Sequence, residues 1–132
     1  GGRLAIVDKR RASATETKQE NIIGGPLDGR VALMFDDMIS TAGSICGAAR
    51  LVQEAGAREI HVAATHGILC GPAMERLHDA PITSVVLTDS VPLPDDRKIP
   101  QIKILTVAPL LAEAIKRIHH DQSISAIFGT GN

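Results

Sequence analysis

The chain alternates between short apolar runs, which are typical of buried strands, and longer segments in which apolar residues recur at helical spacing. The runs predict strands at residues 4–7, 22–23, 31–35, 60–64, 82–87 and 102–107. Helical spacing predicts helices over residues 45–55, 72–77 and 110–118, and strict alternation predicts a last short strand over residues 123–128. The 132 residues therefore predict a single α/β domain, with a mostly parallel sheet flanked by helices on both faces.

The stretch VALMFDDMISTAGS, residues 31–44, combines the longest apolar run with polar chemistry. Its first five residues are typical of a strand buried on both faces of a sheet. Two carboxylates and a loop of small residues follow, and the loop leads into the predicted helix. Backbone N–H groups of such a loop converge with the positive end of the helix dipole, so this stretch predicts a phosphate site. The loop residues are Ser40, Thr41, Ala42, Gly43 and Ser44.

The two carboxylates, Asp36 and Asp37, change the kind of ligand that this loop would take. Negative charge beside an anion site repels a bare chain of phosphates, but it suits a ligand that carries hydroxyl groups close to its phosphate. A sugar phosphate is such a ligand. In the alternative interpretation, both acids only cap the loop and help the helix to begin.

A basic cluster, Lys9, Arg10 and Arg11, follows the first predicted strand. The polar segment that continues to residue 20 has no periodicity and predicts a mobile surface loop. Taken alone, the cluster is typical of a solvated surface. Beside a phosphate-binding domain it would instead neutralise the charge of a phosphoryl group in transfer.

Composition narrows the function classes. Fourteen basic and fifteen acidic residues give a net charge of −1, which provides no general attraction to nucleic acid or to an acidic membrane. No apolar run approaches the ~20 residues that a membrane span needs. Cys46 and Cys70 lack metal-ligand spacing and indicate reduced thiols, so we expect a cytoplasmic protein without its own metal site.

The chain resembles one enzyme family along nearly its whole length. FDDMISTAGS is similar to the ribose-5-phosphate loop of the type I phosphoribosyltransferase fold. AIVDKRR, THGILCGPAMERL, TDSVPLP, LLAEAIKRIH and SISAIF resemble, in the same register, the C-terminal half of ribose-phosphate pyrophosphokinases. The resemblance implies transfer of the diphosphoryl group of magnesium ATP to the 1-hydroxyl of ribose 5-phosphate, which yields phosphoribosyl diphosphate and AMP for nucleotide biosynthesis.

The resemblance also implies roles for single residues. Lys9 and Arg11 match the residues that stabilise the moving group, and Arg11 also binds substrate. The loop Ser40–Ser44 would hold the 5-phosphate, while Asp36 and Asp37 would hold the 2- and 3-hydroxyls. The family forms dimers that assemble into hexamers. Three residues of the tail align with the family's regulatory nucleotide-phosphate site between subunits: Ser123, Ser125 and Phe128. In an equal alternative, the tail is an edge strand that only closes the sheet.

The chain also departs from the family. Ser40 stands where the loop usually carries an aspartate, and the family's enzymes have a second, preceding domain that supplies magnesium ligands and much of the ATP pocket. We therefore expect a C-terminal fragment, or the ordered part of a longer protein, that binds ribose 5-phosphate weakly and does not turn over alone. Two other functions stay open: a base-using phosphoribosyltransferase, and a non-catalytic synthetase-associated subunit. The intact Lys9–Arg11 cluster argues against the second.

Overall fold

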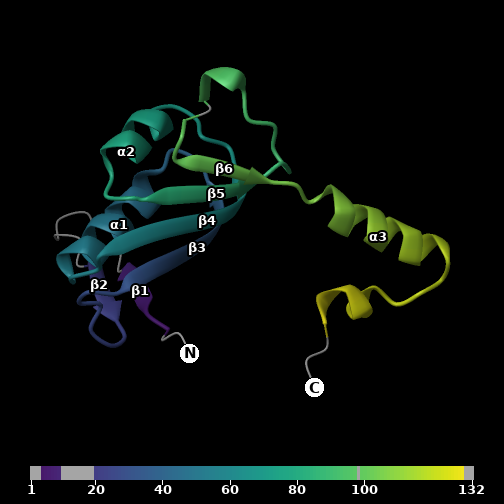
Figure 1. Cartoon of the computed structure of the whole chain (residues 1–132), viewed down its shortest axis with the longest axis horizontal. Coiled ribbons are helices and arrows are strands. Elements are labelled where there is room, and N and C mark those ends of the chain that lie inside the picture. Colours follow the sequence, from purple (N-terminus) through teal and green to yellow (C-terminus); the bar gives the residue numbers. More distant parts are fainter. Residues whose placement is uncertain (1–3, 10–19, 98, 130–132) are drawn as a thin grey trace.

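The computed structural model describes residues 4–9, 20–97 and 99–129 (Figure 1). The elements, in chain order, are β1 (Ile6–Lys9), β2 (Glu20–Ile23), β3 (Val31–Ile39), α1 (Gly43–Glu54), β4 (Glu59–Gly67), α2 (Ala73–Asp79), β5 (Ser84–Thr88), the 3-10 helix η1 (Asp95–Arg97), β6 (Ile102–Leu105), α3 (Ala108–His119) and the 3-10 helix η2 (Ile124–Phe128).

Four parallel strands form the main sheet, in the spatial order β3-β4-β5-β6. Helices α1 and α2 supply the first two crossovers between these strands, as parallel pairing requires. Strands β1 and β2 form a separate antiparallel pair. The predicted α/β class with a mostly parallel sheet and flanking helices is confirmed, but the helices that pack on the sheet, α1 and α2, lie on one face rather than on both.

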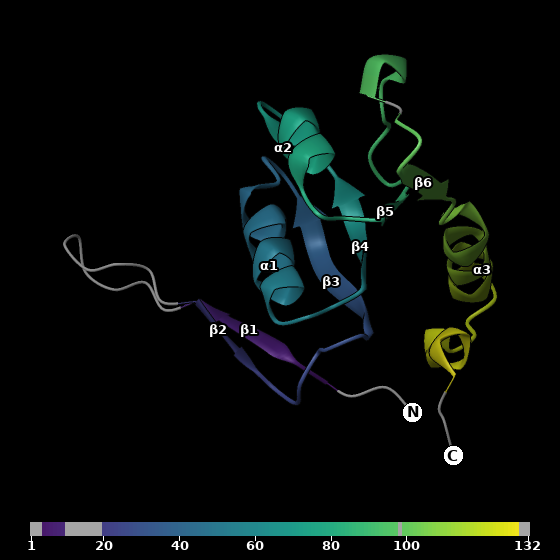
Figure 2. The ribbon, with the colours of Figure 1, turned by 60° about the vertical axis from the view of Figure 1, so that its left-hand side comes forward.

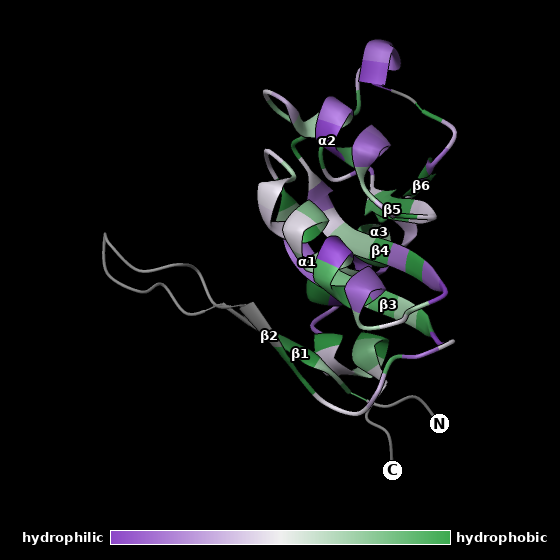
Figure 3. Ribbon diagram, turned by 90° about the vertical axis from the view of Figure 1, so that its left-hand side faces the viewer, coloured by the Kyte–Doolittle hydropathy of each residue, from purple (hydrophilic) through white to green (hydrophobic). Residues whose placement is uncertain are grey.

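The hydrophobic core lies between this sheet and helices α1 and α2, which cover the same face (Figure 2). In β4, alternate residues Ile60, Val62 and Ala64 are buried under the helices. Strand β5 contributes Val85 and Leu87 to the same layer. Both helices also carry hydrophilic residues (Figure 3). The buried residues of each helix recur at helical spacing, so they form one apolar side, and this side packs on the sheet.

The opposite face of the sheet is open in the described part of the chain. Leu33 and Phe35 of β3 are 66% and 77% exposed, and β3 forms an edge of the sheet. The prediction that residues 31–35 are buried on both faces is therefore wrong for the described structure. A continuous apolar run does not show how many faces are covered, because that depends on which elements pack there.

Helix α3 begins after β6 and extends away from the sheet (Figure 1), and none of its residues is buried. The following segment was predicted as a strand but forms η2, which packs on α3. A strand needs a neighbouring strand for its backbone hydrogen bonds, and residues 123–128 pair with none. With three residues per turn, the 3-10 helix instead places Ile124 and Ile127 on one side.

Several element boundaries differ from the sequence prediction by two or more residues; β3, for example, continues to Ile39, four residues beyond its predicted end. Strand β4 continues three residues beyond its predicted end at residue 64, because its pairing with β3 extends to Ile39 and Gly67. Strand β6 ends at Leu105, two residues early. Within the described ranges, no helix has the length and apolar character needed to span a membrane.

Candidate functional site

Strand β3 brings the two acids to the carboxyl end of the sheet, where ligand sites of parallel sheets form. Asp36 lies beside Ala64 of β4. Oδ1 of Asp36 accepts a hydrogen bond from the N–H of Asp37 at 2.9 Å, and Oδ1 of Asp37 accepts one from the N–H of Met38 at 2.7 Å. These bonds engage only Oδ1 of each carboxylate, so Oδ2 can accept a bond from a ligand hydroxyl.

The small-residue loop turns the chain sharply into α1. Ala42, the residue before the helix, has a left-handed backbone with φ 58° and ψ 4°, and no side chain caps the helix start. Asp36 and Asp37 therefore do not cap this helix, because their carboxylates accept hydrogen bonds from N–H groups of their own strand. The alternative in which they only order the loop stays open. No side-chain cap therefore occupies the start of α1, where the helix dipole favours a negative charge.

A pocket of about 190 Å³ is lined by residues 36–45 alone. It brings together every residue of the predicted sugar-phosphate motif, including both acids and the loop from Ser40 to Ser44. The pocket therefore combines hydrogen-bond donors for a monoester with acceptors for hydroxyl groups.

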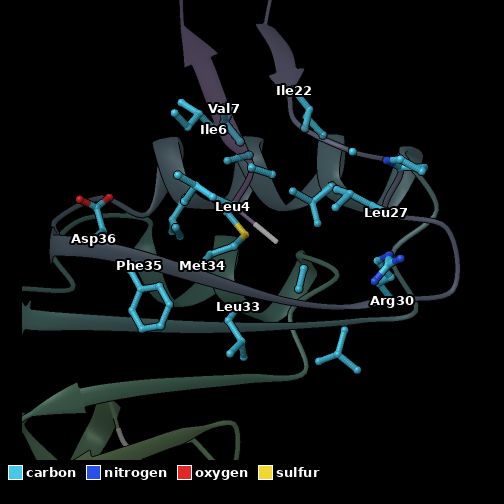
Figure 4. A pocket seen from close by; sticks show the side chains of 18 of the residues that line it. Leu4, Ile6, Val7, Ile22, Leu27, Arg30, Leu33, Met34, Phe35 and Asp36 are labelled. Carbon is cyan, nitrogen blue, oxygen red and sulfur yellow. The ribbon is translucent and has the colours of Figure 1, made fainter. Parts of the chain in front are cut away.

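A larger cavity of about 920 Å³ adjoins the small pocket, between the β1–β2 pair, β3 and α1 (Figure 4). Aliphatic side chains such as Leu4, Val7 and Met34 dominate its lining. Asp36 and Ser44 line both cavities. The smaller pocket contains both acids and the small-residue loop, whereas the larger one is mainly aliphatic.

The loop is held from outside by residues 70–76, which sequence reasoning did not identify. The N–H of Cys70 donates to the carbonyl of Ser40 at 3.0 Å, and the Cys70 sulfur lies 3.3 Å from the Ser40 hydroxyl. Arg76 of α2 donates from its guanidinium to the Thr41 carbonyl at 3.0 Å. No local motif shows such contacts, because the paired residues lie far apart in sequence.

The predicted catalytic cluster is described only in part. Lys9 ends β1, and its backbone lies opposite Glu20 of β2. Arg10 and Arg11 fall outside the described residues. The catalytic role of Lys9 and the two roles of Arg11 therefore stay predictions.

The three candidate regulatory residues lie in and before η2. The Ser123 hydroxyl accepts a hydrogen bond from the N–H of Ser125 at 3.3 Å and caps this helix. The Ser123 carbonyl accepts one from Arg117 of α3 at 3.3 Å, and the Phe128 side chain is exposed. This arrangement ties η2 to α3.

Metal chemistry has little support in the described part of the chain. No three histidine, cysteine, aspartate or glutamate residues there form a group that could hold a metal ion. Asp36 and Asp37 alone supply two carboxylates, fewer than the ligand set of a resident metal.

Comparison with known proteins identifies the family. The sequence model of the phosphoribosyl synthetase-associated domain matches residues 5–129. The chain belongs to this family. The relatives in the comparison are longer than this chain. Each alignment covers nearly all of this chain but less than half of the relative.

Two relatives and one solved structure illustrate this. The chain is 70% identical over 128 residues to ribose-phosphate pyrophosphokinase of Rhodopirellula baltica, covering 97% of the chain and 40% of that protein. It is 45% identical over 125 residues to ribose-phosphate pyrophosphokinase of Bacillus subtilis, covering 95% and 39%. The crystal structure of phosphoribosylpyrophosphate synthetase from Mycobacterium smegmatis aligns with a TM-score of 0.75 at 37% identity, covering 80% of this chain and 35% of that one.

Proposed function

We propose that this chain is the ribose 5-phosphate-binding domain of a ribose-phosphate pyrophosphokinase. The observation that carries the proposal is the 190 Å³ pocket, where two carboxylates and an uncapped helix start share one lining. The 70% identity to a ribose-phosphate pyrophosphokinase supports the same substrate. The matches cover 40%, 39% and 35% of the three compared proteins, and we propose that the remaining length forms the second domain.

In the proposed reaction the 1-hydroxyl of ribose 5-phosphate attacks the β-phosphorus of ATP. A bond forms between O1 and the β-phosphorus, and the bond from the β-phosphorus to the bridging oxygen of the α-phosphate breaks. AMP leaves with that oxygen, and the proton of the 1-hydroxyl passes to water. The pocket would fix the pentose so that O1 points at ATP, and Lys9 and Arg11 would stabilise the charge of the moving group.

Magnesium would enter with ATP as part of the substrate complex. The described residues provide too few ligands for a resident ion. We propose that the protein's own magnesium ligands and most of the ATP pocket lie in the remaining length of the longer enzyme.

Neither alternative function gains support from the relatives. Their names denote a pyrophosphokinase rather than a transferase that uses a nucleobase or a non-catalytic subunit. A base-using enzyme would also need a surface that stacks on the base, and the chain has only two aromatic residues of the Phe, Trp and Tyr class.

Three further properties are proposed with the enzyme. We propose that Ser123, Ser125 and Phe128 contribute to a regulatory nucleotide-phosphate site. We propose that the enzyme is a homo-oligomer built from dimers, which exposed apolar residues such as Ile115 of α3 support, and which light scattering of the full-length protein would test. We propose the cytoplasm as its location, which the two free thiols, Cys46 and Cys70, support.

The experiment that tests the function is AMP release from ATP by the full-length protein, with and without ribose 5-phosphate. We expect release only with the sugar phosphate. In the Lys9→Ala variant we expect AMP release to fall by about a hundredfold or more while ribose 5-phosphate binding persists. AMP release that does not depend on the sugar, or a Lys9→Ala variant with full activity, would contradict the proposal.

A further inference from the structure

The loop that lines the small pocket has an unfavourable geometry and little cationic charge of its own. Ala42 adopts a left-handed backbone, which costs a residue with a side chain about 1 kcal/mol. Residues 36–45 contain two carboxylates and no lysine or arginine. An anion would therefore bind to a strained loop beside two negative charges, unless a neighbouring element compensates.

Helix α2 provides this compensation. The guanidinium of Arg76 donates to the Thr41 carbonyl at 3.0 Å, from 35 residues further along the chain. The bond holds the residue directly before the left-handed Ala42. It also brings a permanent positive charge to the loop, since arginine stays protonated at any physiological pH.

Gly43 shows how close the guanidinium lies. A side-chain carbon added to Gly43 would be 3.0 Å from Nη1 of Arg76, which is tighter than nine in ten real contacts of such a carbon. The glycine therefore leaves room for Arg76. The backbone at the start of α1 and the guanidinium of Arg76 thus lie side by side.

A second contact holds the segment that leads to α2. Arg97 of η1 donates to the Leu69 carbonyl at 2.7 Å. The N–H of Leu69 in turn donates to the carbonyl of Ile39, at the end of β3. Arg76 therefore acts on the loop from a segment that is itself fixed to the sheet, so its side chain can resist displacement of the loop.

We infer that Arg76 is a positioning residue for the sugar phosphate, which it serves by holding the loop at Thr41 in the conformation that receives the monoester and by offsetting the charge of the two acids. The inference rests on the proposed function. Arg76 acts through Thr41 rather than by contact with the reacting atoms. Its loss should therefore weaken binding of ribose 5-phosphate and leave ATP binding nearly unchanged.

The test is the kinetics of the full-length protein with Arg76→Ala and Arg76→Lys. We expect Arg76→Ala to raise the KM for ribose 5-phosphate about ten- to a hundredfold, as expected for a lost hydrogen bond from a charged group, with the KM for ATP within about twofold. The KM for ribose 5-phosphate of Arg76→Lys should lie between those of the wild type and of Arg76→Ala. Methylguanidinium in the buffer should partly lower the raised KM of Arg76→Ala. Arg58→Ala is the matched control, because Arg58 pairs with Glu59 at the opposite end of β4.

The outcomes separate the inference from the proposed function. If the wild-type protein releases no AMP in response to ribose 5-phosphate, the proposed function fails. If the wild type is active but Arg76→Ala leaves the KM for ribose 5-phosphate unchanged, or raises both KM values equally without rescue by methylguanidinium, the inference is overturned. If circular dichroism shows that Arg76→Ala is unfolded, Arg76→Lys decides, and an unchanged KM for ribose 5-phosphate there also overturns it.

Discussion

The carboxylate of Asp89, directly after β5, accepts a hydrogen bond from the backbone N–H of Val107, 2.8 Å away. Val107 precedes the first residue of α3, so this contact ties the helix start to the sheet. The N–H of Asp89 also donates to the Leu105 carbonyl at 3.1 Å. One residue thus holds the junction from which α3 departs.

This junction predicts a dependence on pH. Hydrogen bonds from Thr106 and from the N–H of Val107 hold the pKa of Asp89 below its ordinary value of 3.8. A lowered pKa in the folded state means that the carboxylate stabilises the junction fully above pH 3.8 and loses this contribution as the pH falls through the lowered value. We expect carbon NMR to show Asp89 titrating below 3.8.

The control for this prediction is Asp89→Asn, which keeps an oxygen acceptor but does not titrate. In this variant, the protection of the Val107 amide against hydrogen exchange should no longer change as the pH falls below 3.8, the ordinary pKa of the carboxyl group that it replaces. An Asp89 that titrates above its ordinary pKa, or a variant with the wild-type pH profile, would contradict the assignment.

Gly67 ends β4 against the buried side chain of Leu87. A side-chain carbon on Gly67 would lie 2.5 Å from Cδ1 of Leu87, which is only 1% exposed. We expect Gly67→Ala to lower the free energy of unfolding by about 1–3 kcal/mol, the usual cost of overpacking a core, in urea denaturation. In a Leu87→Ala background the same change should cost less, because the clashing atoms are gone. Strictly additive effects would show that the two positions do not compete for space.

The two thiols should differ in reactivity. Cys46 is 1% exposed, and its burial raises the pKa of the thiol despite the opposing charges of Arg50 and Arg76. Cys70 is only half-buried and lies against the Ser40 hydroxyl. Iodoacetamide should therefore label Cys70 first, and ribose 5-phosphate should slow this labelling. Peptide mass spectrometry measures both rates, with Cys70→Ser as the control, and preferential labelling of Cys46 would refute the prediction.

The local part of the site could be predicted from the sequence. Strand, carboxylates, loop and helix follow one another in residues 31–55, so their order alone brings Asp36, Asp37 and the loop into one pocket. The support of that pocket could not be predicted. The hydrogen bond from Arg76 to Thr41 joins residues 35 apart, and nothing in the pattern of α2 distinguishes Arg76 from an ordinary surface arginine.

The errors in the fold have a similar cause. Whether residues 123–128 form a strand depends on a partner strand, and whether Phe35 is buried depends on a covering layer. Neither is a property of the segment itself. Ser123 instead caps a short helix, an outcome that the alternating pattern of serine and apolar residues also permits.

The roles of the two acids can be separated from the role of the loop by comparing two ligands. If Asp36 accepts a hydroxyl of the pentose, Asp36→Asn should weaken binding of ribose 5-phosphate to the full-length protein about tenfold, because a bond from the sugar to a charged acceptor is lost. Binding of inorganic phosphate should become no weaker, since a negative charge beside the loop is removed. Asp121→Asn is the matched control, because Asp121 lies in the turn after α3 and its backbone, with φ 54°, accepts asparagine equally well. Isothermal titration calorimetry measures both ligands, and an equal loss of affinity for phosphate and for ribose 5-phosphate would show that Asp36 shapes the loop rather than holding the sugar.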